Sequence, residues 1–198
     1  MLNNMKKTLL ALGVSSALML STGCTLSPQM ITLDSGNTLQ VMEPISGRTA
    51  LVRVRDEREL TDRLGNRGGA EPEQSPLIAQ PSLKEALTEK LQGSLQVLGF
   101  GGASPLEPVK VEMIVNQFNY QCNEGDWVNQ CQLDIELRLN IDNNGKVYSQ
   151  PFKLNENRSV AVAPQTEYNR LWINESIDKI WQHIFTKPQV MKALGVSK

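Results

Sequence analysis

Apolar and polar residues alternate strictly from Cys131 to Ile141, and this is the clearest pattern in the chain. Every second position in the run is Cys, Leu or Ile, and Gln, Asp, Glu, Arg or Asn lies between them. Because successive side chains of a strand point to opposite faces of a sheet, the run predicts a β-strand with one buried and one solvated face. A shorter alternation from Val109 to Met113 predicts a second strand.

Turn residues and apolar runs predict further strands around this pair. The Asn-Asn-Gly sequence at 143–145 predicts a hairpin turn into a third strand at 146–154. Pro151 indicates that this third strand is irregular or lies at a sheet edge, because proline has no amide hydrogen to donate. An apolar run at 50–55 predicts an earlier strand, and residues 159–162 are a candidate for a short additional one.

Two amphipathic helices are predicted from apolar residues that recur every three or four positions. Ser82 and Glu85 are expected to form a capping box at the start of the first helix, a leucine stripe follows, and Gly99 ends the helix. The second helix is expected to cover about 166–185 and to end before Pro188, after which one or two further helical turns can form.

The order strand-helix-strand-strand-strand-helix predicts an α+β fold, in which two helices pack on one face of a single mixed, mainly antiparallel sheet. Residues 56–81 are rich in charge, glycine and proline, and they predict a long exposed loop before the first helix. Residues 24–45 mix polar residues with short apolar segments and predict a lipidated tether, with a candidate short strand at its end. The single α+β periplasmic domain is then expected to cover residues 46–198.

The start of the chain follows the pattern of a bacterial lipoprotein signal peptide over residues 1–23. Lys6 and Lys7 precede an uncharged apolar run at 9–20, and small residues then lead to Cys24. The apolar run is too short to span ~30 Å of hydrocarbon, so it favours cleavage over a stable membrane span. Cleavage before Cys24 would let its thiol and its amine carry acyl chains such as palmitate, which together anchor a protein firmly.

Two alternatives stay open in this segment. A lipoprotein signal usually has Leu three residues before the cysteine, but Ser21 stands there, so an ordinary secretory signal that contains a cysteine is the alternative. Translation can start at Met1 or at Met5, since Met5 directly precedes the two lysines.

Composition limits the partners of the mature chain. The signal peptide removes two lysines, so residues 24–198 carry 18 basic and 21 acidic side chains. A balance this close to neutral implies no strong attraction to nucleic acid or to an anionic lipid surface. No later apolar stretch approaches the length of a transmembrane helix, so the lipid is the only predicted anchor.

If Cys24 is acylated, the remaining pair, Cys122 and Cys131, is expected to form a disulfide in an oxidising periplasm. Two free buried thiols are one alternative, and a metal site would need more ligands than these cysteines and the single histidine, His183, supply. The disulfide would clamp a hairpin loop with Trp127 near its tip. Trp127 then either forms a rigid contact point for a partner or folds back over the sheet edge.

The polar residues of the sequence give little indication of a catalytic site. The only histidine lies within an apolar helical run, which favours a packing or surface role over that of a general base. Asp134 and Glu136 lie on the solvated strand face, which is more typical of a wet surface than of a catalytic pair. The charges from Asp56 to Arg67 either pair among themselves or form a partner-binding loop. We therefore expect no enzyme activity, no cofactor and no metal site.

Several segments resemble the YajG-type lipoproteins of Gram-negative bacteria. The resemblance rests on the lipoprotein cysteine, on Pro28–Leu33 soon after it, on Val52–Arg58 and on the Leu-Gly-Asn-Arg sequence at 64–67. A leucine-rich helix that ends in Gly-Phe at 99–100 completes the pattern. The resemblance implies an outer-membrane lipoprotein whose molecular activity is unassigned. Thr25 implies the same location, because known enteric-type lipoproteins that stay in the inner membrane carry Asp at that place.

The leading expectation is an outer-membrane-anchored, periplasm-facing lipoprotein that binds an envelope protein without catalysis. Candidate contact residues are Trp127, Asp56, Arg58 and Arg67. No nucleic acid is expected as a partner.

The alternative expectation is a carrier or chaperone for an apolar ligand such as lipid, held between the helices and the sheet. A pocket lined by Met113, Leu137 and Trp181 would favour this carrier. A flat aromatic patch at Trp127 would favour the protein partner.

Overall fold

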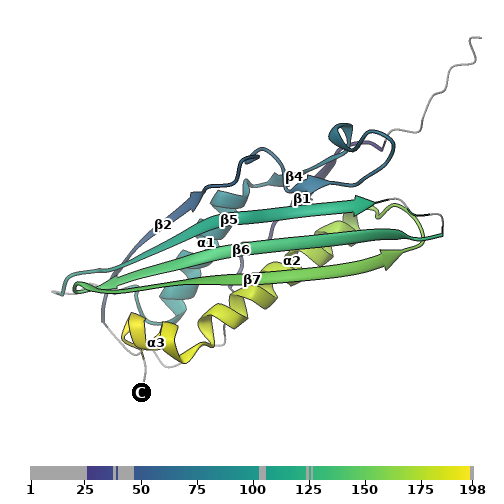
Figure 1. The fold of residues 1–198 in the computed structure, drawn as a ribbon. Helices are drawn as coiled ribbons and strands as arrows, with labels where there is room; N and C mark the ends of the chain where they lie inside the picture. The colour runs from purple at the N-terminus through teal and green to yellow at the C-terminus, as the bar shows by residue number, and fades with distance from the viewer. Residues whose placement is uncertain are drawn as a thin grey trace, which may run out of the picture.

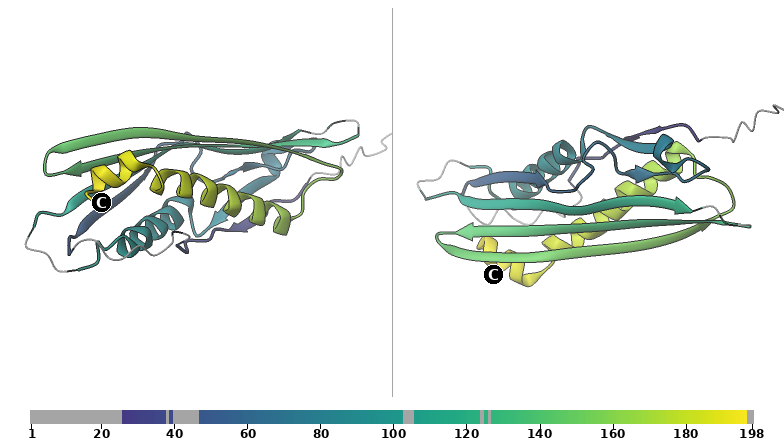
Figure 2. Two further views of the ribbon diagram at one scale, coloured as in Figure 1. Left: turned by 90° about the horizontal axis from the view of Figure 1, so that it is seen from below. Right: turned by 45° about the horizontal axis from the view of Figure 1, so that its top comes forward.

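The computed structural model describes residues 26–37, 39, 47–102, 106–123, 125 and 127–196. Within them, seven strands form one mixed sheet, and three α-helices lie against one of its faces (Figures 1 and 2). The elements in chain order are β1 (Gln29–Thr32), β2 (Ala50–Asp56), β3 (Gly65–Asn66), a 3-10 turn (Pro72–Gln74), β4 (Pro76–Gln80), α1 (Leu83–Val97), β5 (Val109–Asn123), β6 (Asn129–Asn143), β7 (Lys146–Val160), α2 (Thr166–Phe185) and α3 (Pro188–Leu194). The predicted α+β fold is confirmed.

Strands β5, β6 and β7 form the body of the sheet, and each is 15 residues long. They pair antiparallel in sequence order, and β7 lies at the edge of the sheet (Figure 1). On the side away from β6, the first part of β5 pairs with β2 and its last part pairs with β3, and both short strands run parallel to it. Strands β4 and then β1 continue the sheet beyond β3.

The predicted hairpin between β6 and β7 is confirmed. Asn144 and Gly145 have φ angles of 54° and 78°, and a two-residue type I′ turn requires positive φ at both of its central positions. Strand β7 continues to Val160, which pairs with Asn129 at the start of β6. The separate short strand expected at 159–162 is therefore wrong, because β6 is long enough to keep β7 paired to that point.

Helix α1 begins and ends as predicted. The Glu85 amide donates to Ser82 Oγ at 3.3 Å and the Ser82 amide donates to Glu85 Oε2 at 3.0 Å, so the capping box forms. Gly99 follows the last turn with a φ of 90°, and the Phe100 amide donates to the Leu95 carbonyl at 2.9 Å. This bond satisfies a carbonyl that a helix end would otherwise leave unpaired.

Helix α2 carries the two largest buried side chains, Trp172 and Trp181, which are both 0% exposed. Helix α3 provides the further helical turns expected after α2, beginning at Pro188. The buried apolar side chains of the helices and the sheet form one continuous core. In the described part of the chain, no helix is both long enough and apolar enough to cross a membrane.

Two segments differ from the sequence prediction. Within 24–45, predicted as a tether, Gln29–Thr32 is strand β1, and its Ile31 is 0% exposed. Within 56–81, predicted as an exposed loop, β3 and β4 form and Leu77 is 0% exposed. These three strands have two to five residues, and runs this short show no readable alternation. Pairing with distant strands, and not local pattern, makes them part of the sheet.

Candidate functional site

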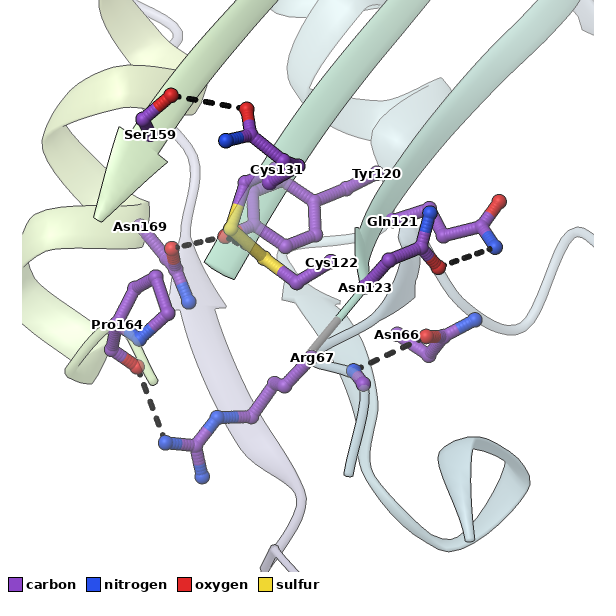
Figure 3. The surroundings of a disulfide bond; sticks show 12 residues. Asn66, Arg67, Tyr120, Gln121, Cys122, Asn123, Cys131, Ser159, Pro164 and Asn169 are labelled. Atoms are coloured by element: carbon purple, nitrogen blue, oxygen red, sulfur yellow. Dashed lines mark hydrogen bonds between the residues drawn. A yellow bond between two sulfur atoms is a disulfide. The ribbon is translucent and has the colours of Figure 1, made fainter. Parts of the chain in front are cut away.

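Cys122 and Cys131 are joined by a disulfide, as predicted. The two residues face each other directly in the β5–β6 register, one at the end of β5 and one at the start of β6. Both side chains lie on the helix-facing side and are buried (Figure 3). The bond therefore clamps the hairpin that Trp127 belongs to.

A chain of buried hydrogen bonds lies beside the disulfide (Figure 3). The Tyr120 hydroxyl donates to Asn169 Oδ1 at 2.6 Å, and Asn169 Nδ2 donates to Gln29 Oε1 at 2.7 Å. Gln29 Nε2 in turn donates to the Pro164 carbonyl at 3.1 Å. These bonds join β5, α2 and β1, and the burial of Tyr120 raises the pKa of its phenol far above the ordinary value.

Arg67 extends this network and is itself buried, with 7% of its surface exposed. Its Nη1 donates to the Ser27 carbonyl at 2.9 Å and its Nη2 donates to the Pro164 carbonyl at 3.0 Å. Gly68 follows with a φ of 80°, and a Cβ there would lie 2.4 Å from the Cys122 carbonyl oxygen, so only glycine allows this close approach. Arg67, a candidate partner contact, is thus engaged inside the protein.

Asp56 and Arg58 form a two-bond ion pair. Arg58 Nε and Nη2 donate to the two Asp56 carboxylate oxygens at 2.8 and 2.7 Å, and the side chains are only 5% and 9% exposed. Arg58 Nη1 also donates to the carbonyls of Arg63 and Phe118, at 2.8 and 3.3 Å. These two charges therefore pair with each other at the end of β2, which leaves neither free to bind a partner.

Trp127 projects from the clamped hairpin. Its side chain is 91% exposed, and the neighbouring Val128 is 40% exposed. At this exposure the ring does not fold back over the sheet edge, which was the alternative expectation. Among the four candidate contact residues, Trp127 is the one whose side chain the fold leaves accessible.

The sheet face away from the helices carries an apolar feature that the sequence prediction missed. Near the start of β5 lies a shallow hollow of about 360 Å³, in which Leu51 is 57% and Val147 is 74% exposed. Charged residues of both signs surround it, including Lys110 and Asp142, with Nζ and Oδ2 3.7 Å apart. We call it the open-face hollow. The sequence signal for this hollow was Val147, because it is an apolar residue at one of the alternating positions that form the polar face of β7.

The residues named for a carrier pocket lie elsewhere. Met113, Leu137 and Trp181 are at most 1% exposed and pack in the continuous core. Trp181 Nε1 donates to Ser94 Oγ at 2.8 Å, so the polar atom of its ring is satisfied within the core. Their positions give no support to the carrier.

The titratable side chains near α2 have structural partners. The exposed His183 packs edge-on against the Phe152 ring, with 5.8 Å between ring centroids. Glu156 accepts bonds from Trp172 Nε1, Ser176 Oγ and Lys179 Nζ at 2.7, 2.9 and 2.6 Å. Burial alone would raise the pKa of Glu156, but these three donors outweigh it and hold the pKa below its ordinary value. The described residues contain no cluster of three or more His, Cys, Asp or Glu that could hold a metal ion.

Comparison with known proteins gives one family match. A family model described as uncharacterized lipoprotein matches residues 38–195. No curated protein matches the chain significantly.

Three of the solved structures that match this chain are crystal structures of the following proteins. One, of an uncharacterized protein, is 17% identical, with 80% of this chain and 99% of that chain covered and a TM-score of 0.43. A protein from Xanthomonas campestris is 9% identical, with 86% and 95% covered and a TM-score of 0.42. A homolog of the neuraminyllactose-binding hemagglutinin from Helicobacter pylori is 14% identical, with 80% and 100% covered and a TM-score of 0.42.

Proposed function

Since this chain belongs to the YajG-type family of lipoproteins, we propose that it is anchored in the outer membrane, faces the periplasm, and acts by binding an envelope protein without catalysis. Family membership supports a membrane-anchored lipoprotein. The signal peptide at 1–23 and the attachment residue Cys24 lie outside the described residues, and this part of the proposal rests on the order of charged, apolar and small residues there.

Changing Cys24→Ala tests the anchor. Without the thiol that receives the lipid, we expect an unprocessed or soluble protein, measured by fractionation of cells and by mass spectrometry of the N-terminal peptide. Unchanged membrane fractionation of the variant, together with no acyl mass on the wild-type peptide, would contradict lipidation at this residue.

Partner binding rests on one observation, the open-face hollow. Exposed apolar side chains surrounded by charges of both signs resemble the composition of a protein interface, which has an apolar centre and a polar rim. We propose that a protein places an apolar side chain against Leu51 and Val147, while its own charges meet Lys110 and Asp142. We propose no catalytic step. The two cysteines are joined to each other, Glu156 accepts bonds from neighbouring side chains, and Asp56 pairs with Arg58.

Crosslinking in intact cells tests this interface. A photo-crosslinking amino acid at position 51 should capture one specific protein, and Val147→Asp should lower its recovery at least about tenfold, as expected for loss of a central contact. Leu171→Asp is the matched control, because Leu171 is also exposed, by 47%, but lies on α2 against the opposite face. Equal loss in both variants, or no specific product from position 51, would refute the proposed interface. Thermal unfolding of each variant checks that the fold is intact.

A further inference from the structure

The N-terminal strand begins at the disulfide end of the sheet. Strand β1 is parallel to β4, β4 is antiparallel to β3, and β3 is parallel to β5, so β1 starts where β5 ends (Figure 1). The bond from Arg67 to the Ser27 carbonyl fixes the chain two residues before β1, and Arg67 and the disulfide lie close together in Figure 3. The chain therefore enters the fold beside the Cys122–Cys131 hairpin.

Little chain separates this entry point from the proposed lipid. Cys24 is three residues before Ser27, and three residues span at most about 11 Å when fully extended. By comparison, the 15 residues of β5 extend over roughly 50 Å. If Cys24 carries the lipid, as proposed above, the disulfide end of the domain must lie close to the membrane.

Exposed apolar side chains gather at this same end. Trp127, Val128 and Val162 are 91%, 40% and 71% exposed. Asn129 pairs with Val160, so the residues just before β6 and just after β7 project together beyond the last strand pair. We call Trp127, Val128 and Val162 the apolar tip. The disulfide and the buried network hold this end in place, so little ordering entropy would be lost when the tip makes a contact.

We propose that the apolar tip rests in the interfacial layer of the leaflet that holds the Cys24 lipid, as a second membrane contact that orients the domain. The tip carries the residue types for this position, because a tryptophan ring is apolar with one polar N–H and prefers the boundary between lipid and water. Acidic residues at 124 and 126 flank Trp127 in the sequence. Attraction to anionic lipid therefore does not drive the contact, which should persist in high salt.

Fluorescence quenching in vesicles tests the orientation. The lipidated protein is reconstituted in phosphatidylethanolamine and phosphatidylglycerol vesicles, with brominated acyl chains in one sample and iodide in the water of another. Trp172 and Trp181, the other two tryptophans, are 0% exposed and should resist both quenchers. The share of emission that Trp127→Phe removes should be quenched by the brominated lipid and protected from iodide.

Two charge variants give a matched comparison. Val162→Asp changes the apolar tip, so it should weaken quenching by brominated lipid and expose Trp127 to iodide. Val147→Asp lies at the far end of the sheet and should leave the quenching of Trp127 by both agents unchanged. If Trp127 in the anchored wild type is quenched by iodide and not by brominated lipid, the tip faces water and a protein contact replaces this proposal. Flotation of the protein with the vesicles is scored separately, so that a failure of the anchor is distinguished from a failure of the tip contact.

Discussion

Tyr120 shows how one buried polar side chain controls the end of the sheet where the chain enters. Its hydroxyl is the donor to Asn169 Oδ1, and Asn169 is itself 0% exposed. A buried acceptor that loses its donor costs about 1–3 kcal/mol, more than an ordinary hydrogen bond contributes. The folded state also keeps Tyr120 protonated at a pH where the unfolded chain ionises it, because burial raises its pKa.

We therefore predict that Tyr120→Phe lowers the free energy of unfolding by about 1–3 kcal/mol at pH 7. In the wild type, the free energy of unfolding should fall as pH rises above about 10, because the unfolded state then loses the phenol proton first. This alkaline loss should be smaller in Tyr120→Phe than in the wild type, because the variant has no phenol at this position. Denaturant unfolding at pH 7, 9 and 10.5 measures both effects, and equal alkaline slopes in the variant and the wild type would disprove the assignment.

Single residues differ in how far the sequence reveals them. The Cys122–Cys131 pair was predictable, because once a third cysteine is assigned to the lipid, chemistry leaves few other uses for two thiols. The burial of Arg67 was not predictable, because this residue lies in a charged, glycine-rich segment, and such a composition indicates an exposed loop. Its acceptors are the carbonyls of Ser27 and Pro164, which are 40 and 97 residues away in the sequence. Backbone carbonyls carry no residue-type signal, so this burial could be seen only in the folded chain.

Among the elements, strand β3 depends on one glycine. Gly65 has a φ of 137°, and a Cβ on it would lie 1.9 Å from the Tyr120 carbonyl oxygen. Real Cβ atoms do not approach a backbone oxygen this closely, so β3 can pair with β5 only if this position has no side chain. The pairing in turn positions Leu64 in the core and Arg67 in the buried network.

Gly65→Ala should therefore destabilise the protein by more than about 3 kcal/mol, since it combines positive-φ strain with a backbone clash. The control is Gly145→Ala, whose φ is 78° but whose Cβ would meet nothing within 4 Å, so it should cost only about 1–2 kcal/mol of strain. Soluble yield and denaturant unfolding compare the two. A loss of similar size in both variants would show that the clash is relieved by movement of β3.

The elements that sequence reasoning found are those with enough residues to show a period. The run from 131 to 141 gave six in-phase apolar positions, and the helix after Ser82 had both a cap and a leucine stripe. Strands β1, β3 and β4 lack such a signal, and β3 is only Gly65–Asn66. Their place is set by the edge of β5 that β2 leaves unpaired, which is a property of the assembled sheet.

For the molecule as a whole, β1 joins the end of the chain that is proposed to carry the lipid directly to the core. Ile31 is 0% and Leu33 4% exposed, so the segment after the entry point is packed and does not act as a free linker. The open-face hollow lies at the opposite end of the long strands, near the start of β5. Membrane attachment and partner binding are thus proposed for opposite ends of one rigid sheet.

Ile31→Ala should lower the free energy of unfolding by about 2–4 kcal/mol, because it removes a fully buried side chain and leaves a cavity. The adjacent Met30→Ala, at a side chain that is 51% exposed, should cost less than about 1 kcal/mol. Urea unfolding of the two variants makes the comparison. If neither substitution changed the free energy of unfolding, residues 29–32 would be part of the tether that the sequence predicted, and not a packed strand.

The position of β7 at the edge of the sheet affects how copies of the protein can associate with one another. A long edge strand can pair with the same edge of a neighbouring copy, and the proposed anchoring in one membrane plane would bring such edges together often. Pro151, opposite Arg138 near the middle of β7, supplies no amide hydrogen there, which interrupts the row of donors that a neighbouring strand would need. The proline thereby disfavours edge-to-edge, fibrous association between copies of the protein.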